Sequence, residues 1–147
     1  MTMKYKIYLD DVRIPKDPEW ILVKNYDEFV QKIQEIGLPN ISTISFDHDL
    51  GDTAMAEYFN NVAPNYKLNY DNITEKTGLD CAKWLINHWM ENRKQIPHQG
   101  FNFPQVYSHS ANPIGAANII GYVNNFFKNM REPQTCIRVR IDHTTRV

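Results

Sequence analysis

The fold of this chain is indicated best by the stretch Ile44-Ser45-Phe46-Asp47-His48-Asp49-Leu50-Gly51, in which a hydrophobic run ends in acidic and imidazole side chains. Two further stretches follow the same plan, Tyr8-Leu9-Asp10-Asp11-Val12-Arg13 and Val106-Tyr107-Ser108-His109-Ser110-Ala111-Asn112-Pro113. A parallel sheet places the carboxyl ends of its strands along one edge, where open α/β folds bind ligands. If the three strands are neighbours, their polar residues meet there, which predicts a site for a divalent metal ion and a phosphate group.

Strand and helix patterns alternate along the chain. The expected strands cover residues 5–9, 20–23, 41–46, 103–108 and 136–141. The expected helices cover residues 26–36, 77–93 and 113–130. This alternation favours an α/β fold with a mostly parallel sheet. We predict one domain over residues 1–147, a three-layer flavodoxin- or receiver-like fold with strand order 2-1-3-4-5, in which the first, third and fourth strands are adjacent.

Helix starts are marked by residues that cap exposed backbone N–H groups. Asn25 is the expected N-cap of the first helix. Asn112 is the expected N-cap of the last helix, and Pro113 occupies the first helical position after it. Thr77 and Asp80 form a variant of the capping box. These signals fix where the predicted helices begin.

A long polar insertion is expected at residues 52–76, directly after the second acidic motif. It is rich in asparagine and aspartate and has little helical or strand periodicity. Such a segment is either a lid over the site or a floppy insertion, and the sequence leaves both interpretations open.

Composition excludes several classes of protein. The chain has 147 residues, 16 basic and 17 acidic, with a formal net charge of −1. This balance argues against bulk binding of nucleic acid but allows a small phosphorylated ligand. No apolar run approaches the roughly 18 residues of a membrane span. Cys81 and Cys136 fit no metal spacing, so we expect a reducing cytoplasm.

Four carboxylates are candidates for binding a metal ion. Asp10, Asp11, Asp47 and Asp49 cannot all be ionised close together without a cation, because like charges about 4 Å apart repel by several kcal/mol. Hard oxygen ligands suit Mg²⁺ or Mn²⁺. We rank Asp11 and Asp47 first, then Asp10, then Asp49. Asp142-His143, after the fifth strand, is a weaker candidate on the same edge.

Two histidines and three further residues are candidates for handling a phosphate. His109 lies just before a helix start, whose N–H groups and positive dipole end attract anions. There it can act as a general acid or base, and Ser110 and Asn112 add donors. Arg13 can clamp a phosphate or neutralise carboxylates. His48, between two aspartates, is an acid–base group, a metal ligand or an outward-facing bystander.

Four motifs in this order resemble those of the cyclic-phosphate processing receiver-like domains. They are Asp-Asp-x-Arg-x-Pro at 10–15, Ser-x-Asp-His-Asp-Leu-Gly at 45–51, Thr-Gly-x-Asp at 77–80 and His-Ser-x-Asn-Pro-x-Gly at 109–115. The resemblance implies a receiver-like sheet whose phosphorylation pocket has become a phosphoesterase site. It also implies substrates that carry cyclic phosphates, as at RNA ends or in nucleotide messengers.

The resulting expectation is a metal-dependent hydrolase, a phosphodiesterase or cyclic phosphodiesterase. Its substrate is a nucleotide, a cyclic oligonucleotide signal or an RNA end. Asp10, Asp11 and Asp47 hold the metal and His109 protonates the leaving oxygen. The other phosphate oxygens are bound by Arg13, Ser110 and the helix start at Asn112.

Two alternatives use the same residues. An ordinary receiver would be phosphorylated on Asp47 and would act as a signalling or binding domain. Such receivers need a lysine after the fifth strand, whereas the fifth strand of this chain carries Arg138 and Arg140 and no lysine. A haloacid-dehalogenase-like phosphatase would use Asp47 and Asp49 as its Asp-x-Asp motif, but its downstream lysine and acidic pair have no convincing counterparts here.

Overall fold

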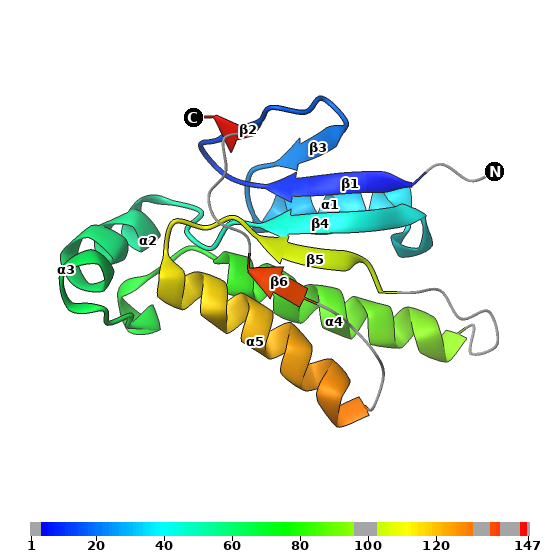
Figure 1. Cartoon of the computed structure of the whole chain (residues 1–147). Helices are drawn as coiled ribbons and strands as arrows, with labels where there is room; N and C mark the ends of the chain where they lie inside the picture. Colours follow the sequence, from blue (N-terminus) through cyan, green and yellow to red (C-terminus); the bar gives the residue numbers. More distant parts are fainter. Residues whose placement is uncertain (1–3, 96–102, 131–135, 139–144, 147) are drawn as a thin grey trace.

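The structure, a computed structural model, describes residues 4–95, 103–130, 136–138 and 145–146. Its centre is a parallel sheet of five strands, shown in Figure 1. The strands are β1 (Tyr5–Leu9), β3 (Trp20–Val23), β4 (Ile41–Phe46), β5 (Gln105–Ser108) and β6 (Cys136–Arg138). They lie in the order β3-β1-β4-β5-β6. The receiver-like sheet is confirmed, and its order is the predicted one when the short strand β2 is set aside.

The register of the sheet aligns the carboxyl ends of its strands. Leu9 lies opposite Phe46, and Phe46 lies opposite Ser108. The next residue of each strand continues the ladder: Asp47 N–H donates to the Leu9 carbonyl at 2.9 Å, and His109 N–H donates to the Phe46 carbonyl at 3.0 Å. The polar residues of the three motifs therefore begin at the same level of one edge.

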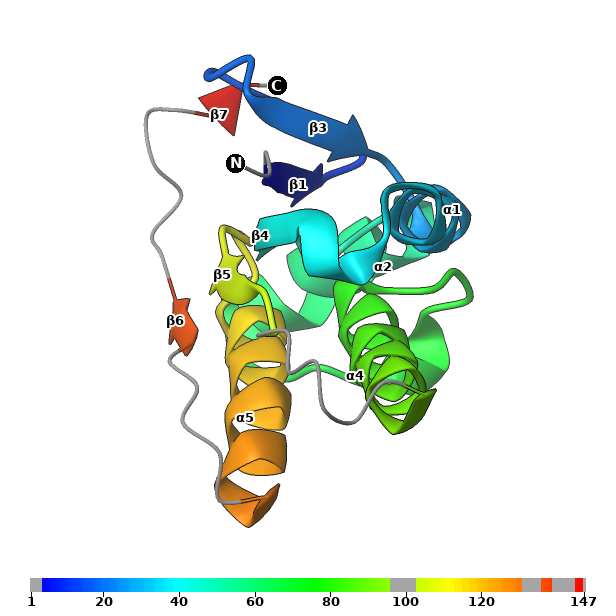
Figure 2. The same ribbon diagram turned by 90° about the vertical axis from the view of Figure 1, so that its right-hand side faces the viewer.

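The long helices form a single layer. They are α1 (Tyr26–Ile36), α4 (Gly78–Gln95) and α5 (Pro113–Met130), and Figure 2 shows all three on the same face of the sheet. Each one connects parallel strands in the same direction across the sheet, and right-handed crossovers then place them on one face. In the described part of the chain no helix covers the other face, so the arrangement differs in this respect from the three layers predicted.

The connection between β1 and β3 accounts for the missing layer. It contains Pro15 and Pro18, and instead of a helix it forms β2 (Ile14–Pro15). This strand pairs antiparallel with β7 (Thr145–Arg146) near the C-terminal end. Of the predicted last strand, the structure describes Cys136–Arg138. Residues 139–144, with Arg140 and Asp142-His143, lie outside the described part of the chain, as do residues 96–102.

The core lies between the sheet and the helices. Phe29 and Ile33 of α1 pack with Phe46 of β4, and an aromatic cluster joins α4 to α5. That cluster contains Trp89, Phe103, Phe126 and Phe127. Each fully buried side chain of this size stabilises the fold by about 1.5–3 kcal/mol. None of the described helices combines the length and the apolar character needed to cross a membrane.

The predicted helix caps are confirmed. Glu28 N–H donates to Asn25 Oδ1 at 2.8 Å at the start of α1. At the start of α4, the Thr77 N–H donates to the Asp80 carboxylate at 2.9 Å, which is half of a capping box. These bonds satisfy N–H groups that lack partners in the first helical turn.

The insertion at 52–76 is more regular than predicted. It forms α2 (Asp52–Glu57), a π-helical turn η2 (Tyr58–Val62), α3 (Ala63–Asn65) and a 3-10 turn η3 (Tyr70–Asn72). Figure 1 shows it beyond the carboxyl ends of the strands. The short helices of this segment were not predicted from its weak periodicity, and a lid function stays a prediction.

Two glutamates organise the insertion. Buried Glu57 accepts hydrogen bonds from the Asn69 backbone and from the side chains of Asn61 and Asn72. Glu75 accepts from the Ala54 N–H at 2.8 Å in the first turn of α2. These carboxylates replace the apolar periodicity that the segment lacks.

Candidate metal and phosphate site

Three carboxylates meet at the carboxyl edge of the sheet. Asp10 and Asp11 follow β1, Asp47 follows β4, and one oxygen of each lies within 4.8 Å of the others. Asp10 and Asp47 are buried, while Asp11 is half-buried and reaches the surface. We call these three residues the acidic trio. Among the described residues, this is the group whose geometry fits a metal ion.

Burial, and after it charge repulsion within the trio, raises two pKa values. Burial raises the pKa of Asp47 well above its ordinary value, and Asp10 and Asp49 raise it further against the opposing effect of Arg13. Burial and the charge of Asp10 also raise the pKa of Asp11. A divalent cation would remove this repulsion, so three hard oxygen donors fit Mg²⁺ or Mn²⁺.

Asp10 is held in place by three hydrogen-bond donors and one ion pair. Its Oδ1 accepts from the N–H groups of Val12 at 2.9 Å and Arg13 at 2.7 Å. Its Oδ2 lies 3.0 Å from His109 Nε2 and 3.6 Å from Arg13 Nη1. Burial alone would raise the pKa of Asp10, but the hydrogen bonds from His109 and the two N–H groups outweigh it and lower the pKa. Asp10 is thus an anion with a fixed orientation, and the ranking of the three metal ligands stays a prediction.

His109 is placed beside the trio but does not face open solvent. Its ring stacks on Tyr8, with centroids 4.1 Å apart and an interplanar angle of 9°. Nε2 contacts Asp10, and Nδ1 lies 2.7 Å from the hydroxyl of Ser45. Both ring nitrogens therefore have protein partners. The role of His109 as the acid for a leaving oxygen stays a prediction.

Ser45 was missed as a site residue by reasoning from the sequence. The signal was present, since Ser45 lies two residues before Asp47 in β4 and alternate residues of a strand share a face. It is a buried polar side chain between the buried apolar residues Ile44 and Phe46.

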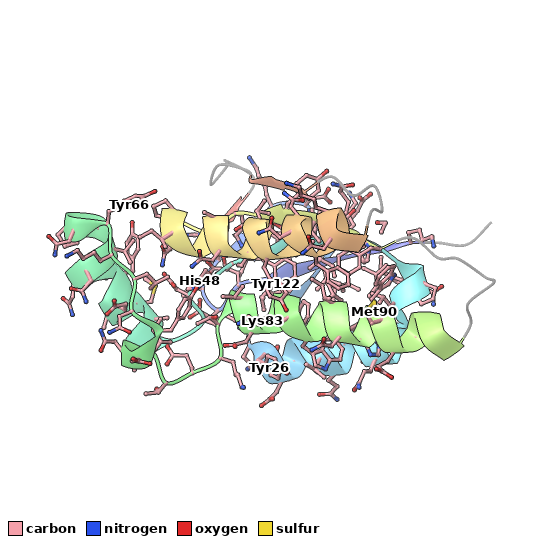
Figure 3. The ribbon with its side chains drawn as sticks, turned by 90° about the horizontal axis from the view of Figure 1, so that it is seen from below. Tyr26, His48, Tyr66, Lys83, Met90 and Tyr122 are labelled. Atoms are coloured by element: carbon pink, nitrogen blue, oxygen red, sulfur yellow. The ribbon has the colours of Figure 1, made fainter. Side chains whose placement is uncertain are left out.

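His48 turns toward the helices and away from His109. It is completely buried, with Nδ1 2.7 Å from Asp49 Oδ1 and Nε2 2.9 Å from the Tyr70 hydroxyl. Figure 3, which views the helices from below, shows His48 between α4 and α5 near the start of both. The Asn118 side chain also donates to Tyr70 at 2.9 Å. His48 thus joins β4, the insertion and α5, and the structure supports neither the catalytic nor the outward-facing interpretation.

The side chains of Asp49 and Asn112 are hydrogen-bonded to each other. Asn112 Nδ2 lies 3.3 Å from Asp49 Oδ1, and Asn112 Oδ1 accepts from the Gly115 N–H at 2.9 Å. Asp49 is therefore absent from the acidic trio, and its predicted metal role is not supported. Asn112 is fully buried as the N-cap of α5, so its predicted contact with phosphate is also not supported.

The other predicted phosphate ligands differ in position. Arg13 contacts Asp10 and donates to the His109 carbonyl at 3.3 Å, so it lies beside the trio with its side chain 19% exposed. Ser110 is buried and accepts from the Asn112 N–H at 3.1 Å in the turn before α5. Arg13 is therefore the better placed of the two for binding an anion.

Two glycines of the motifs allow the helices to approach the Asp47-His48 segment. A Cβ on Gly78 would lie 1.8 Å from the Asp47 carbonyl oxygen, and a Cβ on Gly115 would lie 2.3 Å from Cγ of His48. Gly78 N–H also donates to the His48 carbonyl at 2.8 Å. The starts of α4 and α5 therefore clamp this segment from the helix side, and only glycine fits at either position.

The geometry agrees with one comparison to known proteins. A family model described as a cyclic-phosphate processing receiver domain matches residues 5–125, which include the acidic trio, Arg13 and His109. No curated protein and no solved structure matches the chain. The matched residues span most of the chain, so this protein belongs to the cyclic-phosphate processing receiver domain family.

Proposed function

We propose that this protein is a metal-dependent phosphoesterase that hydrolyses a cyclic phosphate or phosphodiester of a nucleotide, a cyclic oligonucleotide signal or an RNA end. The observation that carries the proposal is the acidic trio, with three carboxylate oxygens within 4.8 Å at the edge where α/β folds bind ligands. The family description, which names cyclic-phosphate processing, supports the reaction class.

Each residue of the site has a distinct part in this proposal. Asp11 and Asp47 are the direct ligands of Mg²⁺ or Mn²⁺, with Asp10 completing the set. A bound ion of this kind polarises a phosphoryl oxygen and makes a bound water more acidic. Arg13 binds a second phosphate oxygen through its guanidinium. His109 keeps Asp10 ionised and oriented through the 3.0 Å contact.

A substrate screen tests the proposal. Wild type is incubated with 2′,3′-cyclic nucleotides, cyclic dinucleotides and RNA ending in a cyclic phosphate, in Mg²⁺, Mn²⁺ or EDTA. We expect turnover of at least one substrate with metal, none in EDTA, and loss of turnover in Asp47→Asn. Asp17→Asn is the matched control, because Asp17 is exposed and its carboxylate accepts from the nearby Glu19 N–H. If wild type leaves every substrate intact with both metals, the enzyme proposal fails.

The second candidate is a receiver that accepts a phosphoryl group on Asp47. It is favoured by the position of Asp47 at the end of the middle strand, beside Asp10 and Asp11. Acetyl phosphate with Mg²⁺ separates the two proposals. An acid-stable, base-labile modification of Asp47 without turnover of cyclic phosphates would favour the receiver, whereas turnover without modification would favour the enzyme.

A further inference from the structure

Three buried polar side chains from three adjacent strands form a continuous chain behind the acidic trio. Ser45 Oγ lies 2.7 Å from His109 Nδ1, and His109 Nε2 lies 3.0 Å from Asp10 Oδ2. The residues are 6%, 3% and 1% exposed, respectively. Tyr8 stacks on the imidazole, so rotation of the ring is restricted. Such burial makes each hydrogen bond costly to lose.

The contacts decide which ring nitrogen carries the proton. Asp10 Oδ1 accepts two backbone N–H groups and Oδ2 lies near Arg13, which is the environment of an ionised carboxylate. An ionised carboxylate only accepts, so the facing Nε2 of His109 must be protonated. In the neutral imidazole Nδ1 is then an acceptor, and the Ser45 hydroxyl is the group placed to donate to it.

We propose that Ser45 is a positioning residue of the site, whose hydroxyl donates to Nδ1 of the Nε2–H tautomer of His109, holds the ring in place and thereby orients the Asp10 carboxylate within the acidic trio. The arrangement follows the general rule that the hydrogen bond made by one ring nitrogen sets the state of the other. The effect on metal binding rests on the proposed function, whereas the tautomer does not.

The tautomer is tested first, in the metal-free protein. Imidazole ¹⁵N chemical shifts distinguish protonated from unprotonated ring nitrogens, and His109→Gln assigns the signals by their loss. We expect a protonated Nε2 and an unprotonated Nδ1 in wild type. A protonated Nδ1, alone or together with Nε2, would overturn the proposal without the need for a variant of Ser45.

The positioning role is tested with a pair of variants. Ser45→Ala leaves Nδ1 without its donor, so it should shift the Nδ1 signal of His109 and weaken Mn²⁺ binding by about tenfold, the lower end for groups that orient metal ligands. Ser45→Thr keeps the hydroxyl on a strand residue and should restore both readouts. Unchanged signals and affinity in Ser45→Ala would overturn the role of Ser45. If wild type binds no Mn²⁺, the proposed function fails, and the ¹⁵N signals of the variants alone decide the case of Ser45.

Discussion

At the scale of single residues, the acidic trio keeps like charges close together at a cost in stability. We predict that Asp47→Asn raises the free energy of unfolding of the metal-free protein by about 1 kcal/mol, because it removes a buried charge that Asp10 repels. The amide oxygen can still accept the His48 N–H that Asp47 Oδ1 accepts at 2.8 Å. Urea unfolding at pH 7 in EDTA measures the change, with Asp17→Asn expected to be neutral. A destabilised Asp47→Asn protein would show that the contacts of the charged carboxylate outweigh the repulsion from Asp10.

The clamp around His48 gives a prediction with an internal control. Gly115→Ala should destabilise the protein by about 3 kcal/mol, because the new Cβ would lie 2.3 Å from the imidazole. Gly121 lies in the same helix, and a methyl group added there would meet nothing within 4 Å, so Gly121→Ala should stabilise by about 0.5–1 kcal/mol. Urea unfolding curves of both variants measure these changes in the free energy of unfolding. Equal changes in the two variants would contradict the steric explanation.

The positions of the site residues could be predicted from the sequence better than their partners. Asp10, Asp11 and Asp47 were expected together because strand ends align, and the structure brings them within 4.8 Å. The face of the sheet on which each histidine side chain lies could not be predicted. Successive side chains point to opposite faces, so a shift of one residue in the position of a strand end reverses the face. His109 therefore contacts Asp10, whereas His48 contacts the insertion.

At the scale of elements, the insertion depends on one carboxylate. Glu57→Gln should make the segment 52–72 more sensitive to limited proteolysis at pH 7, because a neutral amide cannot accept all three donors as strongly. Glu35→Gln is the control, since Glu35 lies on the exposed side of α1 in a surface ion pair with Lys32. Equal cleavage of wild type and Glu57→Gln would contradict the organising role of Glu57.

The same carboxylate predicts a dependence on pH. Hydrogen bonds from the Asn69 N–H and from the side chains of Asn72 and Asn61 hold the pKa of Glu57 below its ordinary 4.5. A lowered pKa in the folded state contributes stability that is complete above the ordinary value and is lost as the pH falls through the lowered one. The difference in amide hydrogen exchange between wild type and Glu57→Gln should therefore be constant at neutral pH and shrink below pH 4.5. A difference that persists in acid would mean that the charge of Glu57 is not involved.

Elements were predicted where their signals are local. The capping hydrogen bonds of Asn25, Thr77 and Asn112 each join residues three positions apart, so the sequence indicates them directly. The short helices of the insertion were not predicted because their stabilising contacts are distant in sequence: Glu57 accepts from Asn72, and Glu75 accepts from the start of α2. Periodicity carries no information about such contacts.

At the scale of the whole molecule, a metal ion at the trio would tie the ends of β1 and β4 together. We predict that Mn²⁺ at about 100 times its Kd stabilises the fold by about 2.7 kcal/mol, since the unfolded chain lacks the site. In thermal unfolding this corresponds to a rise in Tm of about 6–10 °C. EDTA should reverse the rise, and Asp47→Asn should show none. An equal rise in Asp47→Asn would place the ion elsewhere.

The sheet order was predictable, whereas the number of layers was not. Alternating strands and helices with right-handed connections restrict the possible orders to a few. Among the described residues no helix covers the outer face, and Pro15 and Pro18 prevent one between β1 and β3. The two prolines indicated that this connection contains no long helix. The prediction of three layers nevertheless followed the usual arrangement of a doubly wound sheet, which has helices on both faces.

The position of His48 makes it an internal probe of how the molecule is assembled. One of its nitrogens faces Asp49, which follows β4, while the other faces a hydroxyl from the insertion that α5 also holds through Asn118. The imidazole resonance of His48 can therefore report whether the insertion packs against the site through the Tyr70 contact or has moved away from it. Titration with each substrate of the screen while this resonance is followed would show whether ligand binding and seating of the insertion are one event or two.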